Sequence, residues 1–100
     1  MKKLELAKEF ARTLKDAAAE RIILYGSVAR GEDTEESDVD ILVLSSDKQK
    51  TKGKVIEKAI DILLDTGTYI SVKVITPGEF ERLKNTHFIS QITNEGVVIG

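Results

Sequence analysis

The chain has 100 residues, of which 41% are hydrophobic, and a formal net charge of −2 from 15 basic and 17 acidic side chains. This length suits a single domain, residues 1–100, with one hydrophobic core. The balanced charge disfavours nucleic acid as a partner, and the lack of cysteine excludes disulfides, thiolate zinc sites and cysteine nucleophiles. Because no apolar run reaches membrane-spanning length, we expect a soluble, cytoplasmic protein without membrane contact.

The first half of the chain predicts a helix, two strands and a tight turn between the strands. Apolar residues at helical spacing predict an amphipathic helix over 4–20. A short strand over 21–25 follows and stops at the turn over 26–30, which has room for one helical turn before the next glycine. An exposed acidic loop over 32–37 then leads into a buried strand over 38–44.

The second half continues the alternation of helices and strands. Residues 45–54 are polar and lysine-rich and predict a connection, followed by a helix over 55–67 and a strand over 68–75. Thr76, Pro77 and Glu79 form the signature of a helix start, and this helix runs to residue 83. A further short helix from Phe88 to Gly96 and a terminal strand over 97–99 complete the chain. This order, without repeat or linker, predicts one α/β (α+β) domain.

Two aspartates stand at the start of the second predicted strand. Side chains alternate along a strand, so Asp38 and Asp40 face the same way, with Cα atoms roughly 6.5 to 7 Å apart, while Val39 faces the core. Paired carboxylates beside a triphosphate supply the oxygen ligands that Mg²⁺ prefers. Taken alone, the pair favours the simpler interpretation, two solvated charges at a strand end.

The turn between the two strands has the composition of a phosphate-binding turn. Gly26 lets the backbone approach a phosphate, the amides of a helix start point at an anion, and the Ser27 hydroxyl adds a donor. The alternative for an isolated Gly-Ser pair is an ordinary helix cap. Arg30, one turn later, is placed either to contact a phosphate or to pair with the acidic loop.

The spacing of these two signals carries more information than either signal alone. The stretch Tyr25-Gly26-Ser27-Val28-Ala29-Arg30-Gly31, followed by Ser37-Asp38-Val39-Asp40-Ile41-Leu42-Val43, resembles the signature of minimal nucleotidyltransferases in the DNA polymerase beta superfamily. The resemblance is most specific over residues 22–44. It implies a palm-like small mixed sheet backed by helices, in which Gly26 and Ser27 hold a nucleoside triphosphate and the catalytic Asp38 and Asp40 hold Mg²⁺.

The chain departs from the family pattern on the third predicted strand. Fully equipped members carry a third metal-binding carboxylate there, whereas Ser71 stands at the expected position in this sequence. Alternation places Lys73 on the same face, so a cation takes the place of an anion. Glu35, Glu36 and Asp65 are substitutes by composition alone. Whether the chain is catalytically active is therefore left open by the sequence.

The resemblance implies two functions of different classes. The first is an enzyme that transfers a nucleoside monophosphate, AMP from ATP, to a hydroxyl, with a tyrosine of a helical HEPN-type partner of a toxin–antitoxin pair as the acceptor. The second is a catalytically weak or inactive nucleotide-binding antitoxin that acts by complex formation. A polymerase-like enzyme acting on nucleic acid is disfavoured by the neutral charge.

Overall fold

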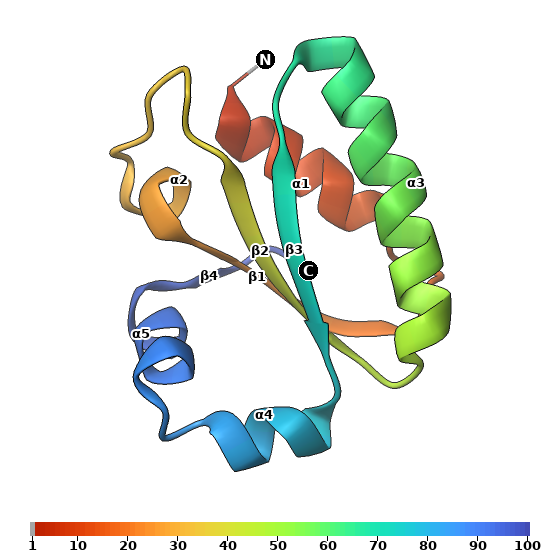
Figure 1. The fold of residues 1–100 in the computed structure, drawn as a ribbon, viewed down its shortest axis with the longest axis vertical. Coiled ribbons are helices and arrows are strands. Elements are labelled where there is room, and N and C mark those ends of the chain that lie inside the picture. Colours follow the sequence, from red (N-terminus) through yellow and green to blue (C-terminus); the bar gives the residue numbers. More distant parts are fainter. Residues whose placement is uncertain (1) are drawn as a thin grey trace.

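The computed structural model describes residues 2–100, which form a four-stranded mixed sheet and five helices (Figure 1). In chain order the elements are α1 (Lys3–Thr13), β1 (Ala19–Tyr25), α2 (Gly26–Arg30), β2 (Val39–Ser45), α3 (Lys48–Thr66), β3 (Ile70–Ile75), α4 (Pro77–Leu83), α5 (His87–Glu95) and β4 (Val97–Val98). The strand order is β3-β2-β1-β4, with β2 parallel to β3 and the other pairs antiparallel. The predicted α/β fold with a small mixed sheet backed by helices is confirmed.

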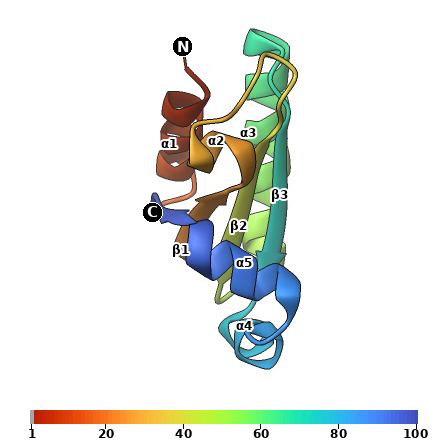
Figure 2. The ribbon, with the colours of Figure 1, turned by 90° about the vertical axis from the view of Figure 1, so that its left-hand side faces the viewer.

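Helices cover both faces of the sheet (Figures 1 and 2). One core cluster joins α1 and α3 to alternate residues of the strands. It includes the fully buried Phe10 of α1, Leu24 of β1 and Ile41 of β2. The intervening residues point to the other face, where Leu42 packs against Ile89 and Ile92 of α5. The two-residue period of the strands therefore assigns every side chain of β2 to one of the two faces. No helix within residues 2–100 is long and apolar enough to span a membrane.

The first helix is shorter than predicted. It ends at Thr13, not near Glu20, and a non-helical segment leads into β1. Leu14 and Ala17 lie in this segment, and their side chains are buried in the core. The apolar pattern therefore continues past the end of the helix. Ala18, with φ 63°, has the left-handed conformation that ends the segment before the strand begins.

The third helix begins earlier than predicted. Residues 45–54 were expected to be a connection, but α3 starts at Lys48, with the Asp47 side chain accepting a hydrogen bond from the Lys50 amide at 3.2 Å. Thr51 is the buried residue of this first part of the helix. Its hydroxyl lies 2.6 Å from the Ser45 hydroxyl and also hydrogen-bonds the Ala17 carbonyl. This polar contact joins the start of α3 to the end of β2.

The predicted helix start at Thr76 is confirmed. The Thr76 hydroxyl accepts from the Glu79 amide at 3.1 Å, and the Glu79 carboxylate accepts from the Thr76 amide at 2.9 Å. These hydrogen bonds, followed by an ion pair with Lys48, lower the pKa of Glu79. Glu79 is thus occupied at the helix cap. It is not available as a metal ligand.

Candidate active site

The two predicted carboxylates lie at the start of the central strand β2. Asp38 directly precedes the strand, which begins one residue later than predicted, and Asp40 is its second residue. Val39 between them is fully buried in the core beneath α1 and α3. The Asp40 side chain therefore points to the opposite face, toward α5, where it is partly buried, while Asp38 is exposed.

The environment of Asp40 disfavours its negative charge. Burial raises the pKa of Asp40, and the neighbouring charge of Asp38 raises it further. The positive charges of Lys73 and Arg30 act in the opposite direction. A partly desolvated carboxylate with a second carboxylate beside it has the chemistry of a cation site, since a bound cation would remove the repulsion between the two.

Gly26 lies directly against the carboxylate of Asp40. Tyr25 pairs with Asp40 across β1 and β2, so the turn from β1 into α2 passes beside the aspartate. A Cβ atom at position 26 would overlap the Asp40 carboxylate and lie 3.3 Å from its Cγ. The residue also has φ +76°, a backbone conformation that side-chain-bearing residues rarely adopt. Glycine is therefore required here by its backbone conformation and by its contact with Asp40.

Ser27 is not a helix cap. The helix α2 already begins at Gly26, and its N-cap position is Tyr25, whose side chain accepts no hydrogen bond from the helix. The interpretation of the Gly-Ser pair as an ordinary cap is therefore wrong. The half-buried Ser27 instead lies in the first turn of α2, on the element that begins beside Asp40.

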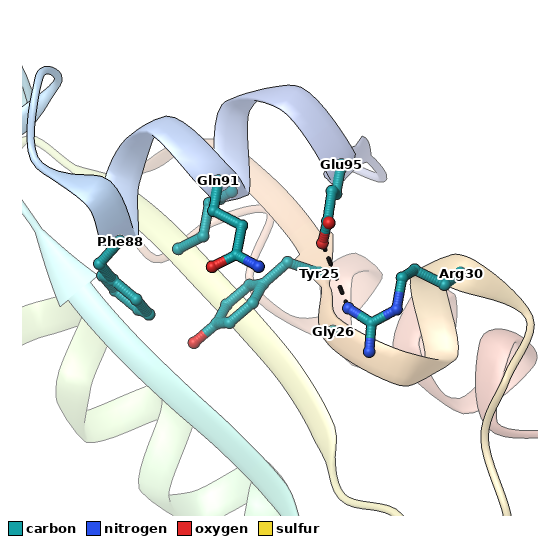
Figure 3. Close-up of a pocket in the computed structure, with 7 residues that line it drawn as sticks. Tyr25, Gly26, Arg30, Phe88, Gln91 and Glu95 are labelled. Atoms are coloured by element: carbon teal, nitrogen blue, oxygen red, sulfur yellow. Dashed lines mark hydrogen bonds and ion pairs between the residues drawn. The ribbon is translucent and has the colours of Figure 1, made fainter.

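Arg30, the last residue of α2, is held between two acidic side chains. Its guanidinium contacts Glu32 of the acidic loop at 2.6 Å. It also contacts Glu95 of α5 at 3.2 Å (Figure 3). These hydrogen bonds raise the pKa of Arg30. The pairing with the acidic loop, one of the two predicted alternatives, is what the structure shows, and Glu95 is an additional partner from the far end of the chain.

A small pocket lies between α2 and α5 (Figure 3), and its lining includes Gly26, the residue that lies against Asp40. It encloses about 160 Å³. Its lining residues are Tyr25, Gly26, Arg30, Phe88, Gln91, Ile92 and Glu95. The ring of Phe88 meets that of Tyr25 edge-on at 5.9 Å. Sequence reasoning missed the contributions of Phe88, Gln91 and Glu95, although their three- and four-residue spacing places them on one side of α5.

Burial raises the pKa of Tyr25 to about 12, and the charge of Asp40 adds to this effect. The phenol of Tyr25 is therefore protonated at neutral pH and is available as a hydrogen-bond donor in the pocket.

Comparison with known proteins identifies the family. Residues 4–99 match the nucleotidyltransferase domain family. The chain belongs to this family. It is 34% identical to the candidate protein adenylyltransferase MJ0141 of Methanocaldococcus jannaschii, an alignment that covers 99% of this chain and all of the relative. It is 36% identical to a second candidate protein adenylyltransferase of this organism, MJ0604, over 92% of each chain.

Solved structures of more distant proteins share the fold. A nucleotidyltransferase candidate from Sulfolobus solfataricus matches with a TM-score of 0.59 at 22% identity, over 95% of this chain and 77% of that chain. A toxin–antitoxin structure with AMP-PNP matches with a TM-score of 0.59 at 20% identity, over 94% of this chain and 72% of that one. A nucleotidyltransferase domain acts on a nucleotide, and the family generally uses a divalent metal.

The third strand of this nucleotidyltransferase domain carries no acid beside the carboxylate pair. Ser71 of β3 is the direct partner of Asp40 of β2 in the sheet register. Lys73, two residues on, shares the face of Ser71 and places its ammonium group 5.7 Å from the centre of the Phe88 ring. As predicted, the position opposite Asp40 carries no carboxylate, and the ammonium group of Lys73 lies on the same face.

Among the residues that the structure describes, no other acid takes the place of the missing carboxylate. Glu35 and Glu36 are exposed in the loop before β2, and Asp65 is exposed near the end of α3. Within residues 2–100 no three acidic, histidine or cysteine side chains gather closely enough to hold a metal ion. The acidic ligands near Asp40 are limited to Asp38 and Asp40, so any metal bound there would need further ligands from a nucleotide or from water.

Proposed function

We propose that this nucleotidyltransferase domain binds Mg²⁺ and ATP and transfers AMP to a hydroxyl group of a partner protein. The observation that carries the proposal is the close contact between Gly26 and Asp40, which joins an anion-binding turn to a cation-binding carboxylate pair. The description of both relatives as candidate protein adenylyltransferases supports the reaction class. The AMP-PNP in a structure of the same fold supports ATP as the nucleotide.

The residues of the turn are proposed to hold the triphosphate. The amides at the start of α2, free of a side-chain cap, and the hydroxyl of Ser27 donate hydrogen bonds to phosphate oxygens. Gly26 lets the phosphates approach because it has no side chain. Arg30 is within one helical turn and would exchange one of its two acidic partners for a phosphate.

The carboxylates are proposed to hold Mg²⁺. Asp38 and Asp40 fit a hard divalent cation because each supplies oxygen ligands and because their mutual repulsion disfavours the cation-free state. When bound, Mg²⁺ neutralises charge on the phosphates and favours in-line displacement. The acceptor oxygen forms the new bond to the α-phosphorus, the bond to pyrophosphate breaks, and the hydroxyl proton passes to solvent.

The acceptor is proposed to belong to a second protein. The pocket beside Asp40 encloses about 160 Å³ and leaves little room for both a nucleotide and an acceptor recognition surface. A tyrosine on a helical HEPN-type protein is the acceptor that the family resemblance favours, with this chain as the antitoxin of a toxin–antitoxin pair. The toxin–antitoxin structure of the same fold supports this context.

One observation favours a second candidate function. Ser71 stands opposite Asp40 where an acid would complete a second metal site, and the adjacent cation of Lys73 opposes metal binding there. A chain with only two carboxylates would bind a nucleotide with one metal ion and act by forming a complex. The second candidate is therefore a nucleotide-binding antitoxin without transfer activity.

Label transfer separates the two candidates. The chain is incubated with Mg²⁺, ATP labelled at the α-phosphate and a helical HEPN-type protein, the proposed acceptor. Transfer predicts covalent label on the partner, lost in Asp38→Ala and retained in Asp33→Ala, a matched control in the exposed loop. A tight complex without covalent label would reject the enzyme and support the interaction module.

A further inference from the structure

The helix α3 exposes an apolar stripe that its own domain does not cover. Ile56, Ile60 and Leu64 are 61%, 50% and 79% exposed, and Leu63 beside them is 39% exposed. Their spacing of three and four residues places them along one side of the helix. Exposed apolar side chains are common singly, but an aligned set on one helix indicates a contact surface.

The stripe borders a groove between α3 and the strand β3. The groove encloses about 240 Å³ and is lined by Ile56 and Ile60 of the stripe, by Ile70 and Val72 of β3, and by the half-exposed Tyr69. The stripe therefore continues onto the strand that lies at the margin of the sheet, and helix and strand form one surface.

The strand β3 is an edge strand with no partner on its outer side within residues 2–100. Figure 2 shows it along one margin of the molecule. Proteins usually protect such an edge with charged side chains, proline or a covering element. The one charged residue of β3 is Lys73, and its ammonium group lies over the Phe88 ring on the face of the sheet, not along the edge. The edge is therefore open to pairing with another strand.

The charges of α3 run against the helix dipole. Lys48, Lys50, Lys52 and Lys54 precede the middle of the helix, whereas three of the four charged residues after it are acidic, namely Glu57, Asp61 and Asp65. A helix alone favours acids at its start and bases at its end. This reversed polarity is complementary to a second α3 that runs in the opposite direction, because the basic half of each helix then lies beside the acidic half of the other.

We propose that the surface formed by the α3 stripe and the β3 edge binds a second copy of this chain. A two-fold axis perpendicular to the sheet pairs the two β3 strands antiparallel and continues the sheet through both copies. The same axis brings the two α3 helices side by side and antiparallel on one face, with their apolar stripes in contact. Each helix of 19 residues is roughly 28 Å long, enough for an extended contact. The carboxylate pair lies on the opposite face and stays open.

Sedimentation equilibrium of the full chain tests this arrangement. The wild-type chain is expected to dimerise with rising concentration, and Ile60→Glu to raise the dimer dissociation constant at least ~10-fold by placing a charge at the centre of the contact. Leu4→Glu, on an exposed leucine of α1, is the matched control and should leave dimerisation unchanged. A wild-type chain that stays monomeric at every concentration would overturn the proposal, even if a helical partner binds the stripe. Equal weakening by Leu4→Glu would also overturn it.

A charge-reversal pair tests the antiparallel orientation. One variant carries Lys50→Glu and Lys52→Glu, the other Asp61→Lys and Asp65→Lys. Each variant alone places like charges against like and should dimerise more weakly than the wild type, whereas an equimolar mixture should form heterodimers and regain the lost association. If either variant alone dimerises as tightly as the wild type, as a parallel pairing of the helices would allow, or if mixing restores nothing, the proposed antiparallel arrangement is wrong.

Discussion

Replacing Gly26 by alanine tests the contact on which the proposed site depends. Two costs are expected. A side chain in the left-handed conformation costs roughly 1–2 kcal/mol, and Gly26 has φ +76°. Overlap of the new Cβ with the Asp40 carboxylate adds overpacking strain of roughly 1–3 kcal/mol. The free energy of unfolding should therefore fall by roughly 2–5 kcal/mol in Gly26→Ala.

The second cost can be isolated by a matched glycine. Gly67, at the end of α3, has the same φ of +76°, and a Cβ placed there meets no atom within 4 Å. Gly67→Ala therefore carries the backbone cost alone. At roughly 4–8 °C per kcal/mol for a domain of this size, the overlap should lower Tm by at least ~4 °C more in Gly26→Ala than in Gly67→Ala.

Thermal unfolding followed by circular dichroism measures both variants, with and without Mg²⁺ and ATP. If Gly26→Ala displaces Asp40, the stabilisation by ligand should be lost in this variant and kept in Gly67→Ala. In a double-mutant cycle, Asp40→Ala should relieve part of the cost of Gly26→Ala, because the overlapping oxygen is then removed. Equal losses of Tm in the two glycine variants, or strict additivity in the cycle, would refute the contact.

Three further outcomes are expected. Because the pKa of Asp40 is raised in the folded chain, its ionised form destabilises the fold, and Asp40→Asn should raise Tm at pH 7. This gain should vanish as the pH falls below about 3.9, the pKa of aspartate in the unfolded chain, because the aspartic acid is then as neutral as the asparagine. Thermal scans across pH check this, and a gain that grows on acidification would contradict it. Thr51→Val should lower the free energy of unfolding by roughly 1–3 kcal/mol, because the Ser45 hydroxyl and the Ala17 carbonyl lose a buried hydrogen-bond partner. Urea titrations measure this, and an unchanged midpoint would show that these hydrogen bonds do not stabilise the fold. Ser71→Asp should increase the rise of Tm on adding Mg²⁺ and raise AMP transfer, whereas Ser71→Asn should change neither; equal responses of the two variants would contradict a third-ligand position.

The sheet and the carboxylate pair were predictable because their signals are local. Asp38 and Asp40 stand two residues apart at the start of a strongly apolar strand, so strand alternation alone relates their side chains. The position of Ser71 opposite Asp40 was also predictable, because the parallel register follows from counting along two strands whose bounds are clear.

The helix ends were less predictable because burial does not stop where helices stop. Leu14 and Ala17 are as buried in a turn as they would be in a helix, so the apolar pattern runs past the true end of α1. At the start of α3 the apolar pattern begins after the helix does. The first turns carry several lysines and one buried polar residue, Thr51, so they lack the apolar spacing that predicts a helix. The cap at Asp47 is the sequence signal that marks the true start.

The pocket could not be predicted because it depends on a long-range contact. Arg30 and Glu95 are separated by 65 positions and meet because α5 packs on the same face of the sheet as Asp40. The period of α5 predicts an apolar side, but nothing in the sequence tells which strand that side covers. The placement of Phe88 against Tyr25 follows from this packing and has no local signal.

The electrostatics of the site indicate which residue separates the two proposed functions. Of the two cations that lower the pKa of Asp40, Arg30 already has two acidic partners, whereas Lys73 has no ion pair among residues 2–100 and rests on an aromatic ring. A triphosphate bound as proposed would bring several negative charges to this face, and Lys73 would offset them without giving up another partner. The same positive charge would weaken the binding of a metal ion beside Ser71. Under the proposed functions, Lys73 would therefore favour nucleotide binding and oppose a second metal ion, so its charge would act on nucleotide binding and on AMP transfer in opposite directions.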